Sequence, residues 1–500
     1  MELQFQSSTC RCMKAEVREA RNAELTQEVR LSDGMPDVGR VIASWGQIIL
    51  RSKEWQGSLV TVSGGIMVWC LYAPEDGSSP RTVDAWLPFQ LKWELKDADG
   101  EGQVRVYPLL RFVDGRGIAA RKIMIRAGVG ALAEALRPVQ RQIYLPEELP
   151  DDIQLLKNTY PIRLMKEAGE KTFLLDEDLQ LPTGGIQPER LLAYTITPQI
   201  QEKRIAADKL VIRGTARLHV LYRCAEGKVH AADAEIPIAH YAQLEETYGS
   251  DAQADVMMGI TSLELLQNEG SQLRVKSGMV CQYLITDRQL LQVVEDAYSP
   301  GREVELRREE LKLSSVLDQR TEVVQAHQKL PAVAADAVVD TVCLPDFPRQ
   351  SRMGEQITLD CAGQFQLLYY TPEGTLQGTS TNWEHTVQMM ADPVSHMSFL
   401  VQPPVAVQAV SAADELHLSS QIKMESWAET CGGIEMVTGL DVSPVFELDE
   451  GRPSLILCRS DGQSLWEIAK RCGSTVEKIM RVNHLEDMPQ ENQMLLIPVS

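Results

Sequence analysis

Few residues in this sequence have the types and spacing that catalysis requires. A strand-like stretch at 121–126 runs into residues 128–133 (GVGALA), the GxGxxA outline of a dinucleotide-binding turn. That turn needs a βαβ unit and an acidic residue about 20 positions further on, and here Glu147 and Glu148 fall in a proline-rich stretch. We therefore expect no nucleotide site and predict that 130–137 is a short helix.

Histidine and cysteine are dispersed along the chain. Alternation along its strand places His219 on an outer, polar face. Cys10 and Cys12 are close together, but no further ligand follows them at metal-binding spacing. Most other cysteines lie in apolar strand patterns, which indicates reduced thiols in a core. HExxH, GxSxG and P-loop motifs do not occur, so we expect no enzyme, no cofactor and no metal site.

The C-terminal segment, 454–500, carries the most specific pattern, in the order strand, helix, helix, strand. The first helix, 465–472, places apolar residues at i, i+3, i+4 and i+7, which is typical of a half-buried helix. Ser464 is placed to cap this helix and Gly473 to end it. A second short helix is predicted around 476–480.

This segment resembles a LysM domain. The matching residues are Gly462, Ser464, Leu465, Trp466, Ile468, Ala469, Val476, Ile479, Asn483, Leu485, Gln493, Leu495, Ile497 and Pro498. LysM domains bind N-acetylglucosamine polymers in a shallow groove between the turn before the first helix and the loop before the last strand. The resemblance therefore implies a ligand groove formed by Ser460, Asp461, Gly462, Gln463, Ser464, Leu465, Met488, Pro489 and Gln490.

The turn departs from the Gly-Asp-Thr that is usual in LysM domains, because residues 462–464 are Gly-Gln-Ser. This change loses a carboxylate but keeps the capping hydroxyl, so we expect the fold to persist and leave open whether the groove binds glycan or protein. Trp466 suits sugar stacking, but beside Leu465 and Ile468 it is more often part of a core. His484 is expected at the surface.

The chain before this segment must position it, and there one strand pattern occurs three times. The copies are 60–72 (VTVSGGIMVWCLY), 210–222 (LVIRGTARLHVLY) and 357–369 (ITLDCAGQFQLLY). Alternate positions are apolar or small, which predicts a long strand with one face in a core, and a glycine midway predicts a bend or bulge. Each copy ends on a tyrosine and an acidic glycine turn, and the tyrosines lie 150 and 147 residues apart. We infer one domain copied three times.

Shorter alternating strands and turn signals surround each copy. The predicted fold is mainly β, with three tandem antiparallel β-sandwich or barrel-like repeats followed by a small βααβ LysM domain. The predicted bounds are 1–147, 148–299 and 300–446 for the repeats, 447–453 for a linker and 454–500 for the LysM domain. Whether the repeats pack together or hang as beads on linkers stays open.

Ahead of a LysM domain, the repeats resemble SPOCS (spore coat assembly) domains in the order of their elements and in the LY(x4)G turn. Proteins that join several SPOCS copies to one C-terminal LysM form a spore-coat morphogenetic class in endospore-forming bacteria. The resemblance implies a non-enzymatic adaptor whose LysM docks a coat-basement protein, the morphogenetic ATPase. It also implies repeats that form an extended spacer with surfaces for self-association or for binding the coat. The alternative is a protein that binds peptidoglycan or cortex glycan.

The composition and net charge of the chain exclude further classes of partner. The content of 44% hydrophobic and 24% charged residues is ordinary for a soluble globular protein. The net charge of −21 argues against nucleic acid, because phosphate binding requires lysine and arginine. Neither a signal peptide nor an apolar run that could cross a membrane is evident. We therefore expect a cytoplasmic protein, in the mother-cell cytosol at the forespore surface.

Overall fold

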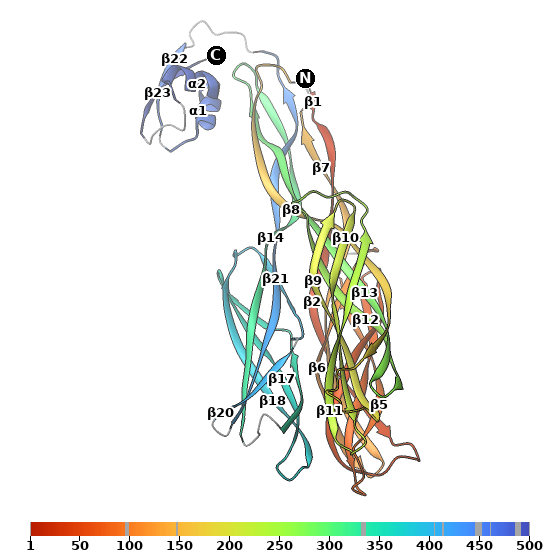
Figure 1. The fold of residues 1–500 in the computed structure, drawn as a ribbon. Coiled ribbons are helices and arrows are strands. Elements are labelled where there is room, and N and C mark those ends of the chain that lie inside the picture. The colour runs from red at the N-terminus through yellow and green to blue at the C-terminus, as the bar shows by residue number, and fades with distance from the viewer. Residues whose placement is uncertain are drawn as a thin grey trace.

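A computed structural model of the chain describes most of its residues. The described ranges are 2–95, 100–146, 149–331, 337–404, 406–412, 415–445, 453–460, 462–485 and 492–499. They form a long β-rich body that narrows into a stem, with a small helical domain beside the end of the stem (Figure 1). The described helices are too short and too polar to cross a membrane.

Three segments of the body repeat one order of strands. The first holds β2 (Gln6–Arg30), β3 (Val38–Gln56), β4 (Leu59–Pro74), β5 (Arg81–Glu94), β6 (Gln103–Ala119) and β7 (Lys122–Leu145). The second holds β8 (Gln154–Gln180), β9 (Arg190–Ala206), β10 (Lys209–Arg223), β11 (Val229–Gln243), β12 (Gln253–Glu269) and β13 (Gln272–Tyr298). The third holds β14 (Val304–Pro331), β15 (Val338–Pro345), β16 (Arg349–Met353), β17 (Gln356–Tyr370), β18 (Leu376–Met390), β19 (His396–Val401), β20 (Val407–Ala412) and β21 (Glu415–Val442).

Each segment folds into two antiparallel sheets. In the first, β4 lies between β3 and β5, while β7 lies between β2 and β6, and the second segment repeats both arrangements. The third does so with interrupted strands, because β15 and β16 together line β17, and β19 and β20 together line β21. One core fills the space between the two sheets of the first segment and includes Val60, Val62, Ile66 and Val68 of β4. The predicted antiparallel sandwich class is therefore confirmed.

The bulge predicted at the glycine of each strand copy is also confirmed. The strand pairing is irregular beside Gly64 and Gly214, and the strand that lines β17 is interrupted beside Gly363. A Cβ at these three glycines would lie only 2.4, 2.0 and 2.4 Å from a carbonyl oxygen of β3, β9 and β15. Glycine is therefore needed because the bulged neighbour comes too close for any side chain. The turn glycines that follow the three tyrosines have φ between +72° and +81°.

The helix predicted at 130–137 is wrong, because these residues belong to β7. The strand pairs with β2 on one edge and β6 on the other, and most of its residues here are fully buried. This pairing overrides the helical preference of an alanine-rich stretch. The two glycines of the GxGxxA outline are also packing positions: a Cβ on Gly128 would lie 2.3 Å from the ring of Phe112, and one on Gly130 would lie 2.9 Å from the ring of Phe347.

The long strands of all three segments run together into the stem. Apolar side chains from each segment meet inside it, among them Cys12, Leu164, Val293, Leu313 and Met436. At the tip, β1 (Glu2–Gln4) pairs with β21 of the third segment. The segments therefore lie side by side around shared contacts and do not hang as beads on linkers.

Contacts between segments also bury the second face of the repeated strand. Leu71, Leu221 and Leu368 stand directly before the tyrosine in the three copies. All three are almost fully buried in one cluster, together with Trp45 and Trp69 of the first segment. Both faces of these strands are thus covered, whereas the alternating pattern indicated only one.

The C-terminal domain has the predicted βααβ order. Its elements are β22 (Leu455–Arg459), α1 (Leu465–Cys472), α2 (Val476–Asn483) and β23 (Met494–Pro498). Ser464 caps α1, Gly473 ends it with φ of +63°, and Thr475 caps α2. His484 ends α2 and is exposed, as predicted. Because the caps and the apolar stripes lie next to each other in the chain, the sequence determines this domain closely.

Candidate functional site

Ser460 ties together the two loops of the predicted LysM groove. Its N–H donates to the carbonyl of Gln493 (2.9 Å), and its carbonyl accepts from the N–H of Asn492 (2.8 Å). Its hydroxyl accepts from the N–H of Gln493 (3.0 Å), and the residue is only 2% exposed. Ser460 therefore fixes the turn before α1 against the loop before β23.

The other described groove residues differ in what they leave accessible. Ser464 forms a capping box with Glu467, in which each side chain accepts a hydrogen bond from the backbone N–H of the other residue. The side chain of Leu465 is buried in the domain core. Gly462 is exposed with φ of +73°, no heavy atom lies within 4 Å of an added Cβ, and Gln463 is half-exposed. Asp461, Met488, Pro489 and Gln490 lie outside the described residues.

Trp466 joins the LysM domain to the stem. Its Nε1 donates to Asp296 Oδ2 (2.8 Å) at the end of β13, and its ring meets the ring of Tyr298 edge-on, with 4.7 Å between centroids. Lys470, one turn further along α1, reaches both carboxylate oxygens of Asp296 at 2.7 Å. The hydroxyl of Tyr298 donates to the carbonyl of Ser474 (3.0 Å). The indole is thus half-buried in an interdomain contact that the sequence did not indicate.

The charges at this contact are complementary. Burial alone would raise the pKa of Asp296, but the hydrogen bonds from Lys470 and Trp466 outweigh it and lower the pKa. Arg308 of β14 adds a further contact at 3.2 Å. Burial, together with the nearby Asp296, raises the pKa of Tyr298 to about 12. Around neutral pH the carboxylate is therefore ionised and the phenol is protonated, as both sets of hydrogen bonds require.

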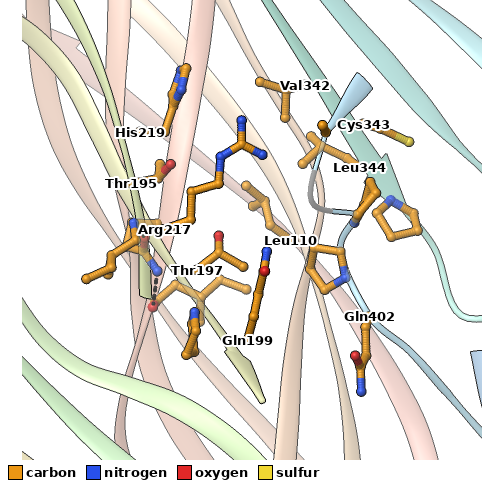
Figure 2. Close-up of a pocket in the computed structure, with 18 of the residues that line it drawn as sticks. Leu110, Thr195, Thr197, Gln199, Arg217, His219, Val342, Cys343, Leu344 and Gln402 are labelled. Atoms are coloured by element: carbon orange, nitrogen blue, oxygen red, sulfur yellow. Dashed lines mark hydrogen bonds between the residues drawn. The ribbon is translucent and has the colours of Figure 1, made fainter. Parts of the chain in front are cut away.

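A second candidate site is a cavity of about 850 Å³ between the three segments. Figure 2 shows that residues spaced two apart on β9 line one side of it, while residues of β15 face them from the third segment. The labelled lining residues are Leu110, Thr195, Thr197, Gln199, Arg217, His219, Val342, Cys343, Leu344 and Gln402. Sequence reasoning missed this cavity because its lining comes from parts of the chain far apart in sequence.

His219 lies at the edge of this cavity between two carboxylates. Its Nδ1 is 2.9 Å from Asp233, and its Nε2 is 3.3 Å from Asp340 of the third segment. Arg217 donates to Asp233 (2.7 Å), and Trp45 of the first segment donates to Asp340 (2.9 Å). His219 lies on the polar face of its strand, as predicted, and the third segment covers this face through Asp340.

This arrangement charges the imidazole. Burial lowers the pKa of His219, but Asp340 and Asp233 outweigh that effect and raise the pKa to about 10. Both ring nitrogens face carboxylates, so His219 at neutral pH is a cation within an ion-pair network. It joins the second and third segments.

A second buried ionic network joins all three segments. Glu134 lies 2.6 Å from Arg18 and 2.8 Å from Arg105, all three almost fully buried. Arg18 also contacts Glu429 of the third segment, and Arg105 contacts Asp255 of the second. A buried charge is tolerated when an opposite charge pairs with it. Because these pairs form only when the three segments are correctly aligned, the network makes the relative placement of the segments specific.

Buried thiols offer little nucleophilic chemistry here. Nine of the ten cysteines have a described side chain and are free, and burial raises the pKa to about 11 for Cys70 and Cys361 and to about 12 for Cys281 and Cys343. Thiols with such pKa values stay protonated and unreactive at neutral pH. Among the described residues, no group of three histidine, cysteine or acidic side chains could hold a metal ion.

Two family models match the chain. The model described as SipL, SPOCS domain, matches residues 187–265, which contain β9, β10, β11 and the first part of β12. The LysM domain model matches residues 461–498. No curated protein and no solved structure matches the chain.

Both matched domains are binding or adaptor modules. They indicate a sporulation-associated protein that carries a module of the peptidoglycan-binding type. The β-sandwich segments and the docked βααβ domain fit this assignment. The chain therefore combines a SipL-type SPOCS domain with a C-terminal LysM domain, the architecture that its sequence resembles.

Proposed function

We propose that this protein is a non-enzymatic structural adaptor of the bacterial endospore coat whose LysM domain docks a coat-basement morphogenetic protein. The proposed partner is the morphogenetic ATPase of the coat basement, and the proposed location is the mother-cell cytosol at the forespore surface. In this proposal the SPOCS-like repeats span 1–147, 148–299 and 300–446, a linker spans 447–453, and the LysM domain spans 454–500.

The observation that carries the proposal is how the LysM domain is held. Asp296 and Tyr298 at the end of β13 bind α1 and the turn that follows it. The module is therefore presented at one end of a long body, on the side that leaves β22 and β23 facing outward (Figure 1). An adaptor needs this geometry because a partner on the LysM and another on the repeats are then kept apart at a set distance.

The ionic contacts between segments support the same function. The networks around Glu134 and His219 connect the three segments, so the body holds its binding surfaces at a fixed distance from each other. Two weak contacts on one such body reinforce each other, because binding at the first raises the effective concentration at the second. Such multivalency suits a layered coat.

Glycan binding is the second candidate, and one observation favours it. Gly462 is exposed with open space around it and Gln463 is half-exposed, and LysM domains recognise sugar largely through backbone groups of this turn. In this alternative the groove residues predicted from the sequence contact N-acetylglucosamine. We favour protein docking because Gln463 stands where the usual turn has a carboxylate, and Ser460 and Ser464 use their hydroxyls within the fold.

A two-armed capture experiment with the full chain tests the proposal. One arm offers insoluble peptidoglycan, and the other offers a soluble lysate of sporulating cells in which the coat-basement ATPase carries an affinity label. We expect capture of the labelled ATPase and no retention on glycan. Retention on glycan that N-acetylglucosamine oligomers compete away, without capture of the ATPase, would replace docking by wall binding.

A matched variant makes the glycan arm informative. Gln463→Asp restores a carboxylate to the turn, whereas Gln463→Asn changes only side-chain length. If the turn governs sugar recognition, Gln463→Asp gains retention on peptidoglycan and Gln463→Asn does not. The same gain in both variants would show that the turn carboxylate is irrelevant to glycan binding.

A further inference from the structure

The two-stranded sheet of the LysM domain has an apolar outer face. Leu455, Leu457, Met494 and Leu496 are 54%, 62%, 52% and 45% exposed, whereas the residues between them pack against the helices. Leu457 and Leu496 are direct cross-strand partners, so the exposed side chains form one patch. Docking of α1 on the stem turns this face away from the body (Figure 1).

One edge of this sheet is closed by a side chain. Asn483 accepts a hydrogen bond from the N–H of Leu496 (2.8 Å) and donates to its carbonyl (2.7 Å). The amide thus occupies the backbone groups through which another strand would pair with β23. It also donates to the carbonyl of Ile479 (2.8 Å), which holds it on the end of α2.

The other edge, along β22, is open. Ser454 and Ser460 direct their backbone groups to β23, since they bond Val499, Asn492 and Gln493. Alternation in an antiparallel ladder then directs the N–H and C=O groups of Leu455 and Leu457 the opposite way. In the described part of the chain, β22 pairs with no strand except β23.

A cation lies next to β22, on the face of the sheet that the helices cover. Arg471, in the last turn of α1, places its guanidinium 3.2 Å from Cys458 Sγ of β22. The side chain is exposed, and no described carboxylate lies within ion-pair distance of it. A matching ligand therefore offers a carboxylate at the end of the strand near Cys458.

We propose that the open edge of β22 is a docking site for an extended segment of a protein partner, with alternating apolar side chains and a carboxylate beside Arg471. The segment adds as a third strand: its backbone bonds Leu455 and Leu457, and its apolar side chains extend the leucine patch. The inference rests on the proposed protein-docking function and names the surface that performs it. This surface differs from the predicted sugar groove, which lies beyond the end of β22.

A second copy of the chain fits this edge less well. The exposed side chains of the patch offer on the order of 400 Å², about half of the roughly 800 Å² per partner that a stable interface buries. The strand of a second copy, LILCR, also brings no carboxylate to Arg471. A second copy that paired edge to edge through β22 would form the same main-chain hydrogen bonds as a foreign strand. The missing carboxylate for Arg471 is therefore what favours a foreign strand.

Blocked hexapeptides test the site on the full chain. The probes alternate valine and threonine and carry aspartate at the N-terminal end for antiparallel addition or at the C-terminal end for parallel addition. We expect one of them to bind and to slow hydrogen exchange of the amides in 454–460 at least tenfold. Leu457→Lys and, separately, Arg471→Glu should weaken binding at least fivefold.

Matched controls separate this effect from general loss of apolar surface or charge. Leu174→Lys changes an equally exposed leucine on β8, and Arg481→Glu reverses a charge on α2; both should bind like the unaltered chain. The inference fails if neither peptide slows hydrogen exchange of the amides in 454–460, or if the Leu457→Lys variant binds the peptides as tightly as the unaltered chain. A dimer in sedimentation that Leu457→Lys abolishes would make the occupant a second copy and overturn it as well.

These experiments distinguish failure of the β22 docking site from failure of the proposed docking function. If Leu457→Lys and Arg471→Glu still capture the coat-basement ATPase, docking stands and the β22 site is wrong. If the unaltered chain captures no ATPase and N-acetylglucosamine oligomers protect 462–465, the docking function itself is wrong.

Discussion

Replacing Asp296 with alanine should release the LysM domain from the stem. The substitution removes the acceptor of the Trp466 indole, a hydrogen bond to a charged group worth about 1.5–3 kcal/mol. It also removes the ion pair with Lys470, which is 42% exposed and after solvent screening contributes about 0.5 kcal/mol. The docking free energy should fall by about 2–3.5 kcal/mol, a drop of roughly 30- to 400-fold in the docking equilibrium constant.

Unfolding of the LysM domain in urea reports this change. Docking stabilises the folded domain by mass action, so its free energy of unfolding should fall by about 2 kcal/mol in Asp296→Ala. Hydrogen exchange of 465–474, read at each urea concentration, isolates this domain from the β body. Asp178→Ala removes an exposed carboxylate from β8 and should change the value by less than about 0.5 kcal/mol.

A double-mutant cycle identifies the contact responsible. Trp466→Phe keeps the ring against Tyr298 but removes the N–H donor, so it should share most of its loss with Asp296→Ala. We expect a coupling energy of about 1 kcal/mol or more. If the two losses add within about 0.3 kcal/mol, the hydrogen bond does not hold the domain on the stem and the reasoning is refuted.

Three further predictions concern the β body. Glu134→Gln leaves two buried arginines short of a carboxylate and should cost about 3–5 kcal/mol in urea unfolding, against less than about 0.5 kcal/mol for Glu28→Gln in an exposed pair. Gly214→Ala should cost at least about 2 kcal/mol, because its Cβ would meet a carbonyl oxygen at 2.0 Å, while Gly249→Ala, with open space around it, should be nearly neutral. The pKa of His219 is raised to about 10, so its ion pairs stabilise the fold fully below pH 6.5 and lose this effect as pH rises to 10; the destabilisation by His219→Gln should therefore be larger at pH 6 than at pH 10, and an equal loss at both would contradict the charged assignment.

Local patterns predicted the parts of this protein whose contacts are local. The LysM helices follow from Ser464, Gly473 and their apolar stripes, all of which act within a few residues. The sandwich strands follow from alternation, and the bulge at Gly214 follows from a glycine within an apolar strand. In each case the signal and its physical cause occupy the same stretch of chain.

Contacts between segments could not be found in this way. Arg105 and Asp255 form an ion pair although they are 150 residues apart, and nothing near either residue indicates the other. The same limitation explains the wrong helix at 130–137, where pairing on both edges of β7 decides the conformation against local preference. Trp466 illustrates it too, since its partner lies on β13.

Because β1 pairs with β21, the order of synthesis bears on how the body is completed. The residues of β1 are synthesised more than 400 positions before Asp441, Leu440 and Gly439, so they find these partners only when that part of β21 has left the ribosome. Until then this edge of the stem is unfinished, so a nascent chain exposes an unpaired strand end for most of its synthesis. When several ribosomes translate one message, the β1 strand of one nascent chain meets the β21 strand of its neighbour as well as its own. The rate at which β1 pairs with its own β21 then decides whether single chains or interlinked chains form.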